Sequence, residues 1–221
     1  MVVPIKAIIF DFDGTLANTL PVCDYAFQHV FKEFDQRDLS SAEIRAMFGP
    51  SETGIIRKNL LHGDTEEAIE LYYTKYLEQH GQLVDHNQEI HELLLHLRKK
   101  GMKLGIVTGK ARRSLDISLK ALQMEHFFDA IITGDDVAQP KPDPEGLFKA
   151  LAMLDVSPQE AIFIGDSDAD IQAGISANVL TVGVHWLPDY QTLEFAVAPN
   201  SSYRTAAEFM ESLETGGHYE S

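Results

Sequence analysis

The sequence is poor in cysteine and in basic residues, and it lacks any long hydrophobic run. Its one cysteine, Cys23, excludes an internal disulfide framework and fits a reducing compartment. No apolar stretch approaches the ~20 residues that a transmembrane helix needs. The N-terminal residues also lack the basic and apolar regions of a signal peptide. We therefore expect a cytoplasmic protein without a membrane partner.

The scarcity of positive charge narrows the choice of partners. The chain has 18 Lys and Arg against 34 Asp and Glu, which gives a formal net charge of −16. Nucleic-acid binding demands basic patches, so a nucleic acid is excluded as the expected partner. A small anionic molecule is still compatible if a metal, a lysine or helix N-termini supply local positive charge. No long exposed apolar stripe stands out, so we expect a monomer or a homodimer.

Short apolar runs with strand character recur along the chain. They cover Ile5–Phe10, Lys103–Thr108, Ala130–Thr133, Ala161–Gly165 and Val179–Val184. Helical patterns lie between the later runs, at His91–Lys100, Ser114–Leu122, Pro144–Leu154 and Asp168–Ala177. Strands that alternate with helices of this length predict an α/β fold with a parallel sheet and right-handed crossovers.

The first run breaks this alternation, because no further strand candidate appears before Lys103. The segment between contains four helical patterns, at Val22–Phe34, Ser41–Phe48, Glu52–Leu61 and Thr65–His80. Ser40 and Asp64 have the character of N-caps followed by acidic first turns. We therefore expect a helical cap domain at 17–86, inserted into a core domain of 1–16 and 87–221. Its hinges fall near 17–21 and 81–87, and the polar tail from Glu214 is expected to fray.

Two acids follow the first strand directly, in Asp11-Phe12-Asp13-Gly14-Thr15. In an open α/β sheet, ligands bind at the carboxyl ends of the strands. Two carboxylates one residue apart repel each other, so they need a cation or a shared proton. The placement suggests a Mg²⁺ site with a nucleophilic carboxylate, and hence phosphoryl chemistry. Taken alone, the motif is also compatible with an ordinary Asp- and Gly-rich turn.

Three further motifs stand near later strand ends. Thr108 and Gly109 offer a hydroxyl and an amide for phosphate oxygens, and the proline-rich loop 139–144 holds Lys141 in a stiff segment. Asp166 ends another strand, and neighbouring strands lie ~4.8 Å apart, so it could share a metal with Asp11. Each motif alone has an ordinary explanation as a loop, a solvated lysine or a helix cap. Together they indicate one site.

With these motifs, the chain resembles the haloacid dehalogenase superfamily. The resemblance rests on Asp-Phe-Asp-Gly-Thr, Thr108, Lys141 and Gly-Asp-Ser-x-x-Asp at 165–170, and it covers nearly the whole chain. It points to the phosphatase branch with a helical cap after the first strand, and in particular to phosphoglycolate phosphatases and pyrophosphatase-type enzymes. The resemblance implies a Rossmann-like parallel sheet core with helices on both faces, plus the inserted cap.

The resemblance also implies catalytic roles. Asp11 would attack phosphorus and form an aspartyl-phosphate, which replaces one hard step by two easier ones. Asp13 would protonate the leaving oxygen and later deprotonate the attacking water. Thr108 and Gly109 would bind the phosphoryl oxygens, and Lys141 would balance their charge and that of Asp11.

For the metal, the resemblance implies Mg²⁺ held by the Asp11 side chain, the Asp13 backbone carbonyl, Asp166 and waters, in keeping with the few protein ligands that Mg²⁺ prefers. Asp170 would orient Lys141 or a metal-bound water. The next acid in this loop, Asp168, is expected to be a solvated or capping residue.

Substrate choice is expected on the cap, which would close as a lid over the site. The candidates are Gly49 and Ser51 in the loop between two cap helices, and Arg57 one turn into the next helix. Arg57 could meet a second anionic group of the substrate, or it could be an ordinary surface arginine. Lys110 is a second candidate for that role. The expected substrate is a small phosphomonoester of the phosphoglycolate type.

Other chemistries of the superfamily can be weighed against single residues. Dehalogenases and phosphonate-cleaving members lack an acid at the position of Asp13, so both are disfavoured. Cys23 stands where β-phosphoglucomutase carries a cap histidine, which disfavours a mutase. An inorganic pyrophosphatase and a sugar-phosphate phosphatase or mutase remain alternatives. A catalytically silent binding module on the same fold is an alternative of another class.

Overall fold

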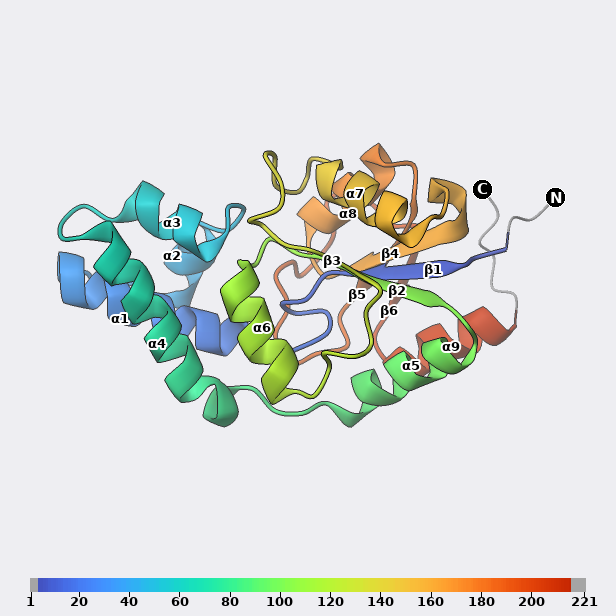
Figure 1. Cartoon of the computed structure of the whole chain (residues 1–221), viewed down its shortest axis with the longest axis horizontal. Coiled ribbons are helices and arrows are strands. Elements are labelled where there is room, and N and C mark those ends of the chain that lie inside the picture. Colours follow the sequence, from blue (N-terminus) through green and yellow to red (C-terminus); the bar gives the residue numbers. More distant parts are fainter. Residues whose placement is uncertain (1–3, 216–221) are drawn as a thin grey trace.

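The computed structural model describes residues 4–215, and the sheet within this range has six strands, all parallel (Figure 1). They are β1 (Ala7–Phe10), β2 (Lys103–Val107), β3 (Ala130–Ile132), β4 (Ala161–Gly165), β5 (Leu180–Val184) and β6 (Ser201–Tyr203). Their order is β3-β2-β1-β4-β5-β6, so the first strand of the chain lies at the centre of the sheet. The prediction of an α/β fold with a parallel sheet is confirmed.

The register of the central strands brings distant motifs to one edge of the sheet. Phe10 at the end of β1 pairs with Ile106 of β2 and with Ile164 of β4. Asp11 follows Phe10 directly, and Asp166 stands two positions after Ile164. All four residues of β1 are buried, in keeping with its continuous apolar sequence. Parallel pairing of buried strands therefore positions the acidic motifs side by side.

Helices cover both faces of the sheet (Figure 1). On one face, α7 (Glu145–Leu154) and α8 (Asp168–Ser176) pack in a cluster with Ile9 and Phe163. On the other, α5 (Gln88–Lys99), α6 (Arg112–Ala121) and α9 (Ala206–Glu214) pack in a cluster with Ile8 and Phe10. A short 3₁₀ helix, η1 (Pro158–Glu160), precedes β4. The predicted arrangement of helices on both faces is thus confirmed.

The remaining helices lie together at one end of the molecule, beyond the sheet (Figure 1). They are α1 (Leu20–Asp35), α2 (Ser41–Arg45), α3 (Glu52–Asn59) and α4 (Thr65–Leu83). Aromatic side chains fill their interior, and the rings of Phe27 and Tyr72 are 4.6 Å apart between centroids. Ser40 and Asp64 accept backbone hydrogen bonds as the N-caps of α2 and α4, as expected. The boundaries of a separate cap domain at 17–86 stay a prediction.

Three features differ from the sequence-based expectation. The predicted hinge from Gly81 is wrong in its first residues, because α4 continues to Leu83 and the amide of Val84 still bonds to His80. The strand β6 and the helix α9 were not anticipated. The predicted fraying tail lies almost wholly outside the described residues.

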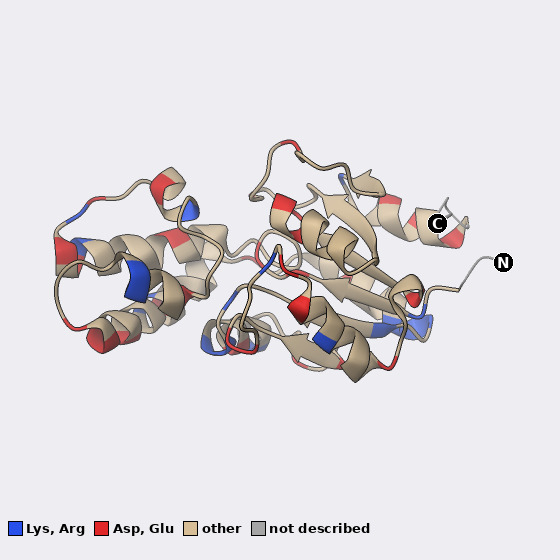
Figure 2. Ribbon diagram, turned by 90° about the horizontal axis from the view of Figure 1, so that it is seen from above, with Lys and Arg blue, Asp and Glu red and all other residues tan. Residues whose placement is uncertain are grey.

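Acidic residues are spread over both the helical end and the sheet end of the molecule (Figure 2). Within residues 4–215, none of the helices combines the length and the apolar character needed to cross a bilayer.

Candidate active site

The turn after β1 wraps around Asp166. Gly14 has φ +83°, and a Cβ at this position would lie 2.3 Å from Asp166 Oδ2, so a glycine is required here. The Thr15 hydroxyl donates a hydrogen bond of 3.1 Å to Asp166 Oδ1. From the other side, the indole N–H of Trp186 donates to the Thr15 carbonyl at 2.7 Å. The Asp-Gly-Thr turn therefore holds a carboxylate from β4 against the end of β1.

Three buried carboxylates meet at this edge of the sheet. One oxygen from each of Asp11, Asp166 and Asp170 lies within 4.8 Å of the others. Lys141 Nζ lies 2.7 Å from Asp11 Oδ1 and 2.5 Å from Asp170 Oδ1, and the backbone N–H of Gln191 donates to Asp166 at 2.6 Å. The structure thus brings together residues from four separate segments of the chain.

The cluster of Asp11, Asp166 and Asp170 has less positive charge than its buried carboxylates need. Burial raises the pKa of Asp11 to about 7, although the Lys141 ammonium opposes the rise. Burial, followed by the charges of Asp11 and Asp170, also raises the pKa of Asp166 well above its ordinary range. One lysine does not balance three carboxylates. Carboxylate oxygens are hard donors of the kind that Mg²⁺ and similar cations prefer, so the residues fit a divalent metal.

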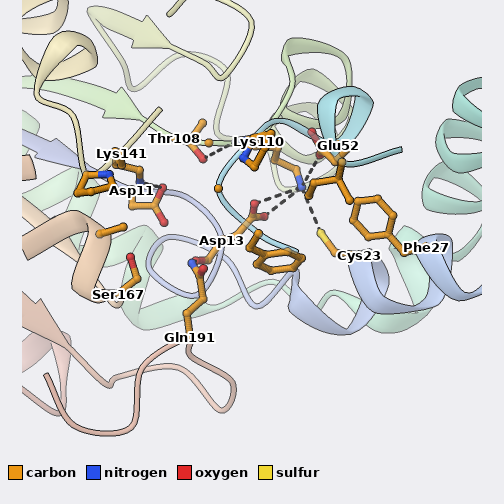
Figure 3. A pocket seen from close by; sticks show the side chains of 17 residues that line it. Asp11, Asp13, Cys23, Phe27, Glu52, Thr108, Lys110, Lys141, Ser167 and Gln191 are labelled. Carbon is orange, nitrogen blue, oxygen red and sulfur yellow. Dashed lines mark hydrogen bonds and ion pairs between the residues drawn. The ribbon is translucent and has the colours of Figure 1, made fainter. Parts of the chain in front are cut away.

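Asp13 has different partners from Asp11, although only one residue separates them. Its carboxylate turns towards Lys110 (Figure 3), whose Nζ lies 3.0 Å away, and it also accepts a hydrogen bond from the Thr19 hydroxyl. Its backbone carbonyl accepts a hydrogen bond of 3.3 Å from the Gln191 side chain. The two carboxylates of the motif are therefore paired with different lysines, which leaves them free to take different roles.

The predicted catalytic and phosphate-binding residues line one cavity of about 290 Å³ (Figure 3). The sheet side contributes Asp11, Asp13, Thr108, Gly109, Lys110, Lys141, Pro142, Ser167, Ala169 and Gln191. The helical end contributes Cys23, Phe27, Phe48, Gly49, Pro50, Glu52 and Ile55. A cavity of this size between a polar floor and an apolar wall suits a small metabolite.

The predicted specificity residues divide into two groups. Gly49 and Lys110 line the cavity, whereas Ser51 and Arg57 do not. The Ser51 hydroxyl contacts that of Thr53 at 3.1 Å. Arg57 is half-exposed and forms an ion pair of 3.0 Å with Glu66 of α4. The position of Arg57 does not support contact with a substrate, because α3 directs its side chain away from the cavity.

Several residues of the site were missed by sequence reasoning. Ser167 caps α8 and donates through both its hydroxyl and its amide to Asp170; the motif Gly-Asp-Ser-x-x-Asp contains it, but no role for Ser167 was predicted from the sequence. Gln191 lies in an irregular segment that carries no local signal. Asp168 stays outside the acid cluster, as expected, and accepts a bond of 2.7 Å from the amide of Ala196.

Comparison with known proteins places the chain in a family. Residues 8–184 match the model of the haloacid dehalogenase-like hydrolases. The pyrophosphatase PpaX of Bacillus mycoides is 36% identical over 182 residues, which cover 82% of this chain and 84% of PpaX.

Two solved structures share the fold over nearly the whole chain. CbbY from Rhodobacter sphaeroides, in complex with phosphate, superposes with a TM-score of 0.82 at 24% identity and covers 95% of this chain and 99% of its own. A predicted phosphoglycolate phosphatase from Haemophilus somnus superposes with a TM-score of 0.83 at 22% identity, with coverages of 96% and 99%. The predictions of fold and of a phosphatase-type hydrolase agree with these findings. The chain belongs to the haloacid dehalogenase-like hydrolase family.

Proposed function

We propose that the protein is a Mg²⁺-dependent phosphatase that hydrolyses a small phosphomonoester through an aspartyl-phosphate on Asp11. The position of Asp11 carries this proposal. Its carboxylate lies on the cavity floor, 2.7 Å from the Lys141 ammonium and within the acid cluster. Thr108 and Gly109 line the same cavity, so groups that bind phosphoryl oxygens surround the nucleophile.

In the first step, a carboxylate oxygen of Asp11 attacks phosphorus, and the bond between phosphorus and the leaving oxygen breaks. Asp13 gives its proton to that oxygen, so the product leaves as an alcohol. Lys141 balances the charge of Asp11 and of the phosphoryl group, while the Thr108 hydroxyl and the Gly109 amide hold the phosphoryl oxygens.

In the second step, a water molecule attacks the phosphorus of the aspartyl-phosphate and loses a proton to Asp13. The bond between phosphorus and the Asp11 oxygen breaks, and inorganic phosphate leaves. Asp11 returns as a carboxylate and Asp13 as a carboxylic acid, so the site is ready for another substrate. One water is consumed for each ester cleaved.

Asp11, Asp166 and the Asp13 carbonyl would hold the cation, whose charge would offset that of the phosphoryl group. Asp170 has its two carboxylate oxygens engaged, one with Lys141 and the other with Ser167. This supports a positioning role for Asp170 towards Lys141 rather than a place among the direct ligands.

A pyrophosphatase is the second candidate, favoured by the similarity to PpaX of Bacillus mycoides. The presence of Asp11, Asp13, Lys141 and Asp166 in one site disfavours the catalytically silent module. A sugar-phosphate phosphatase is a variant of the first proposal, since it differs only in the leaving group.

The test is phosphate release from a panel of phosphomonoesters and pyrophosphate, with Mg²⁺ and with EDTA. We expect release that depends on Mg²⁺, with kcat/KM above ~10⁴ M⁻¹s⁻¹ for the best substrate. The Asp11→Asn variant should keep the fold and lose this activity. Absence of release from every compound would overturn the proposal and favour the silent module.

A further inference from the structure

Lys110 occupies the boundary between the polar floor and the apolar wall of the cavity (Figure 3). None of its side chain is exposed to solvent. Its ammonium lies 3.0 Å from Asp13, 3.4 Å from Glu52, 3.4 Å from the Cys23 sulfur and 4.5 Å from the centre of the Tyr76 ring. A buried ammonium is stable in such a place because carboxylates and an aromatic face replace water around it.

Glu52 is the partner of Lys110 from the helical end. Its side chain is buried in the first turn of α3, and its other contacts reach across to α6. One carboxylate oxygen accepts a bond from the amide of Ala111, and the other from the Ser114 hydroxyl. These two bonds fasten the Glu52 carboxylate beside Lys110, so the pair is a fixed part of the cavity wall.

The described part of the cavity lining therefore offers no unpaired cation. Lys141 is shared by Asp11 and Asp170, and Lys110 is shared by Asp13 and Glu52. The rest of the wall beside Lys110 is apolar and comes from Cys23, Phe27, Phe48, Pro50 and Ile55. A second anionic group on a substrate would meet the Glu52 carboxylate beside the Lys110 ammonium, so this part of the wall offers it no net positive charge.

We infer that Glu52 is a specificity-determining residue, which neutralises Lys110 and selects phosphomonoesters whose leaving group carries no charge. The inference rests on the proposed phosphatase function and deepens it. It replaces the expectation that Lys110 meets a second anionic group. Esters of uncharged alcohols fit the site, whereas phosphoglycolate and pyrophosphate are disfavoured.

A matched pair of esters tests this directly. 2-Hydroxyethyl phosphate and 2-phosphoglycolate have leaving groups of similar size, and only the second carries a carboxylate. With Mg²⁺, we expect the wild-type protein to have a kcat/KM at least about tenfold higher for the hydroxyethyl ester, the ratio that one charge contact typically produces. A wild-type preference for phosphoglycolate or pyrophosphate would overturn the inference.

The Glu52→Gln variant removes one negative charge and keeps the size of the side chain. We expect it to raise kcat/KM for phosphoglycolate and pyrophosphate relative to the hydroxyethyl ester by about tenfold, mainly through KM. Glu66→Gln is the matched control, because it removes the same charge from the exposed surface of α4. An unchanged ratio in a folded Glu52→Gln variant, or an equal change in Glu66→Gln, would contradict the assignment.

A binding measurement tests the inference separately from turnover. In an Asp11→Asn background, calorimetry should show tighter binding of the hydroxyethyl ester than of phosphoglycolate. Adding Glu52→Gln should narrow or reverse that difference. If the phosphatase proposal is wrong, the wild-type protein will hydrolyse neither ester. The binding preference would still show whether Glu52 selects between them.

Discussion

The Lys141 ammonium lies 2.7 Å from the Asp11 carboxylate, although 130 residues separate the two in sequence. The same ammonium contacts Asp170 at 2.5 Å. Burial alone would lower the pKa of Lys141, but the charges of Asp11 and Asp170 raise it above its ordinary value. One side chain therefore forms ion pairs with acids that follow two different strands, and it links the stability of the fold to the chemistry of the site.

Replacement of Lys141 by methionine should destabilise the metal-free protein by roughly 3–5 kcal/mol, because two buried carboxylates lose their cation. Urea unfolding in EDTA measures this change. Lys149→Met is the control, since its pair with Glu145 is partly exposed and should contribute much less. Equal losses of unfolding free energy in the two variants would show that the buried Lys141 pairs stabilise the protein no more than the exposed Lys149 pair.

Mg²⁺ should stabilise the protein against thermal unfolding. A ligand at a hundred times its dissociation constant adds about 2.7 kcal/mol to the free energy of unfolding. We expect Asp166→Asn to lose most of this stabilisation. Asp168→Asn should keep it, because Asp168 bonds to Ala196 outside the acid cluster. Calorimetric scans of all three proteins with and without Mg²⁺ measure the effect, and retention by Asp166→Asn would place the metal elsewhere.

Asp11→Asn should reduce turnover by at least about a thousandfold, the scale expected when a nucleophile is removed. The circular dichroism spectrum should stay unchanged, because the amide keeps the size of the side chain and Lys141 keeps Asp170. Phosphate release under saturating substrate is the measurement. Activity near the wild-type level would show that another group is the nucleophile.

The stability of the protein should fall in mildly acidic solution because of His80. This ring is buried, its Nε2 lies 2.9 Å from the Ser118 hydroxyl, and its neighbours include Tyr76 and the Lys110 charge. Burial, and then Lys110, lower its pKa from 6.5 to about 4. Between these values the unfolded chain binds more protons, so stability is complete above pH 6.5 and declines as the pH falls to 4.

The expected contribution of His80 to this decline is roughly 2–3 kcal/mol. Urea unfolding of the wild-type protein and of His80→Gln at several pH values isolates it from the titration of the carboxylates. The variant should have the flatter profile by that amount. Parallel profiles would mean that His80 titrates alike in the folded and unfolded chains.

The position of the acidic motifs could be predicted from the sequence because it depends on the strands that precede them. The apolar run before Asp11 and the run before Asp166 predict buried parallel strands, and the carboxyl ends of such strands share an edge. This topological rule brings Asp11 and Asp166 together, whereas the roles of these residues and of Lys141 in the loop 139–144 were implied by the resemblance to the family. The capped helices after Ser40 and Asp64 were equally accessible, since a cap is a local hydrogen bond.

Other features depend on pairings that no local pattern encodes. The phase of α3 decides that Glu52 points into the cavity and that Arg57 pairs with Glu66 outside it. Gln191 reaches Asp166 from an irregular segment, where no periodicity indicates its direction. Strand β6 has the polar sequence Ser201–Tyr203 at a sheet edge, so it lacks the apolar run by which the other strands were recognised.

The hydrogen bond from Trp186 to the Thr15 carbonyl gives the site an optical reporter. The chain contains one tryptophan, so its tryptophan emission comes from a single indole, bonded to the turn that holds Asp166. Any ligand that moves this turn changes the surroundings of that indole. Binding of such a ligand can therefore be followed by tryptophan fluorescence in the unlabelled protein, including in variants that no longer turn over substrate.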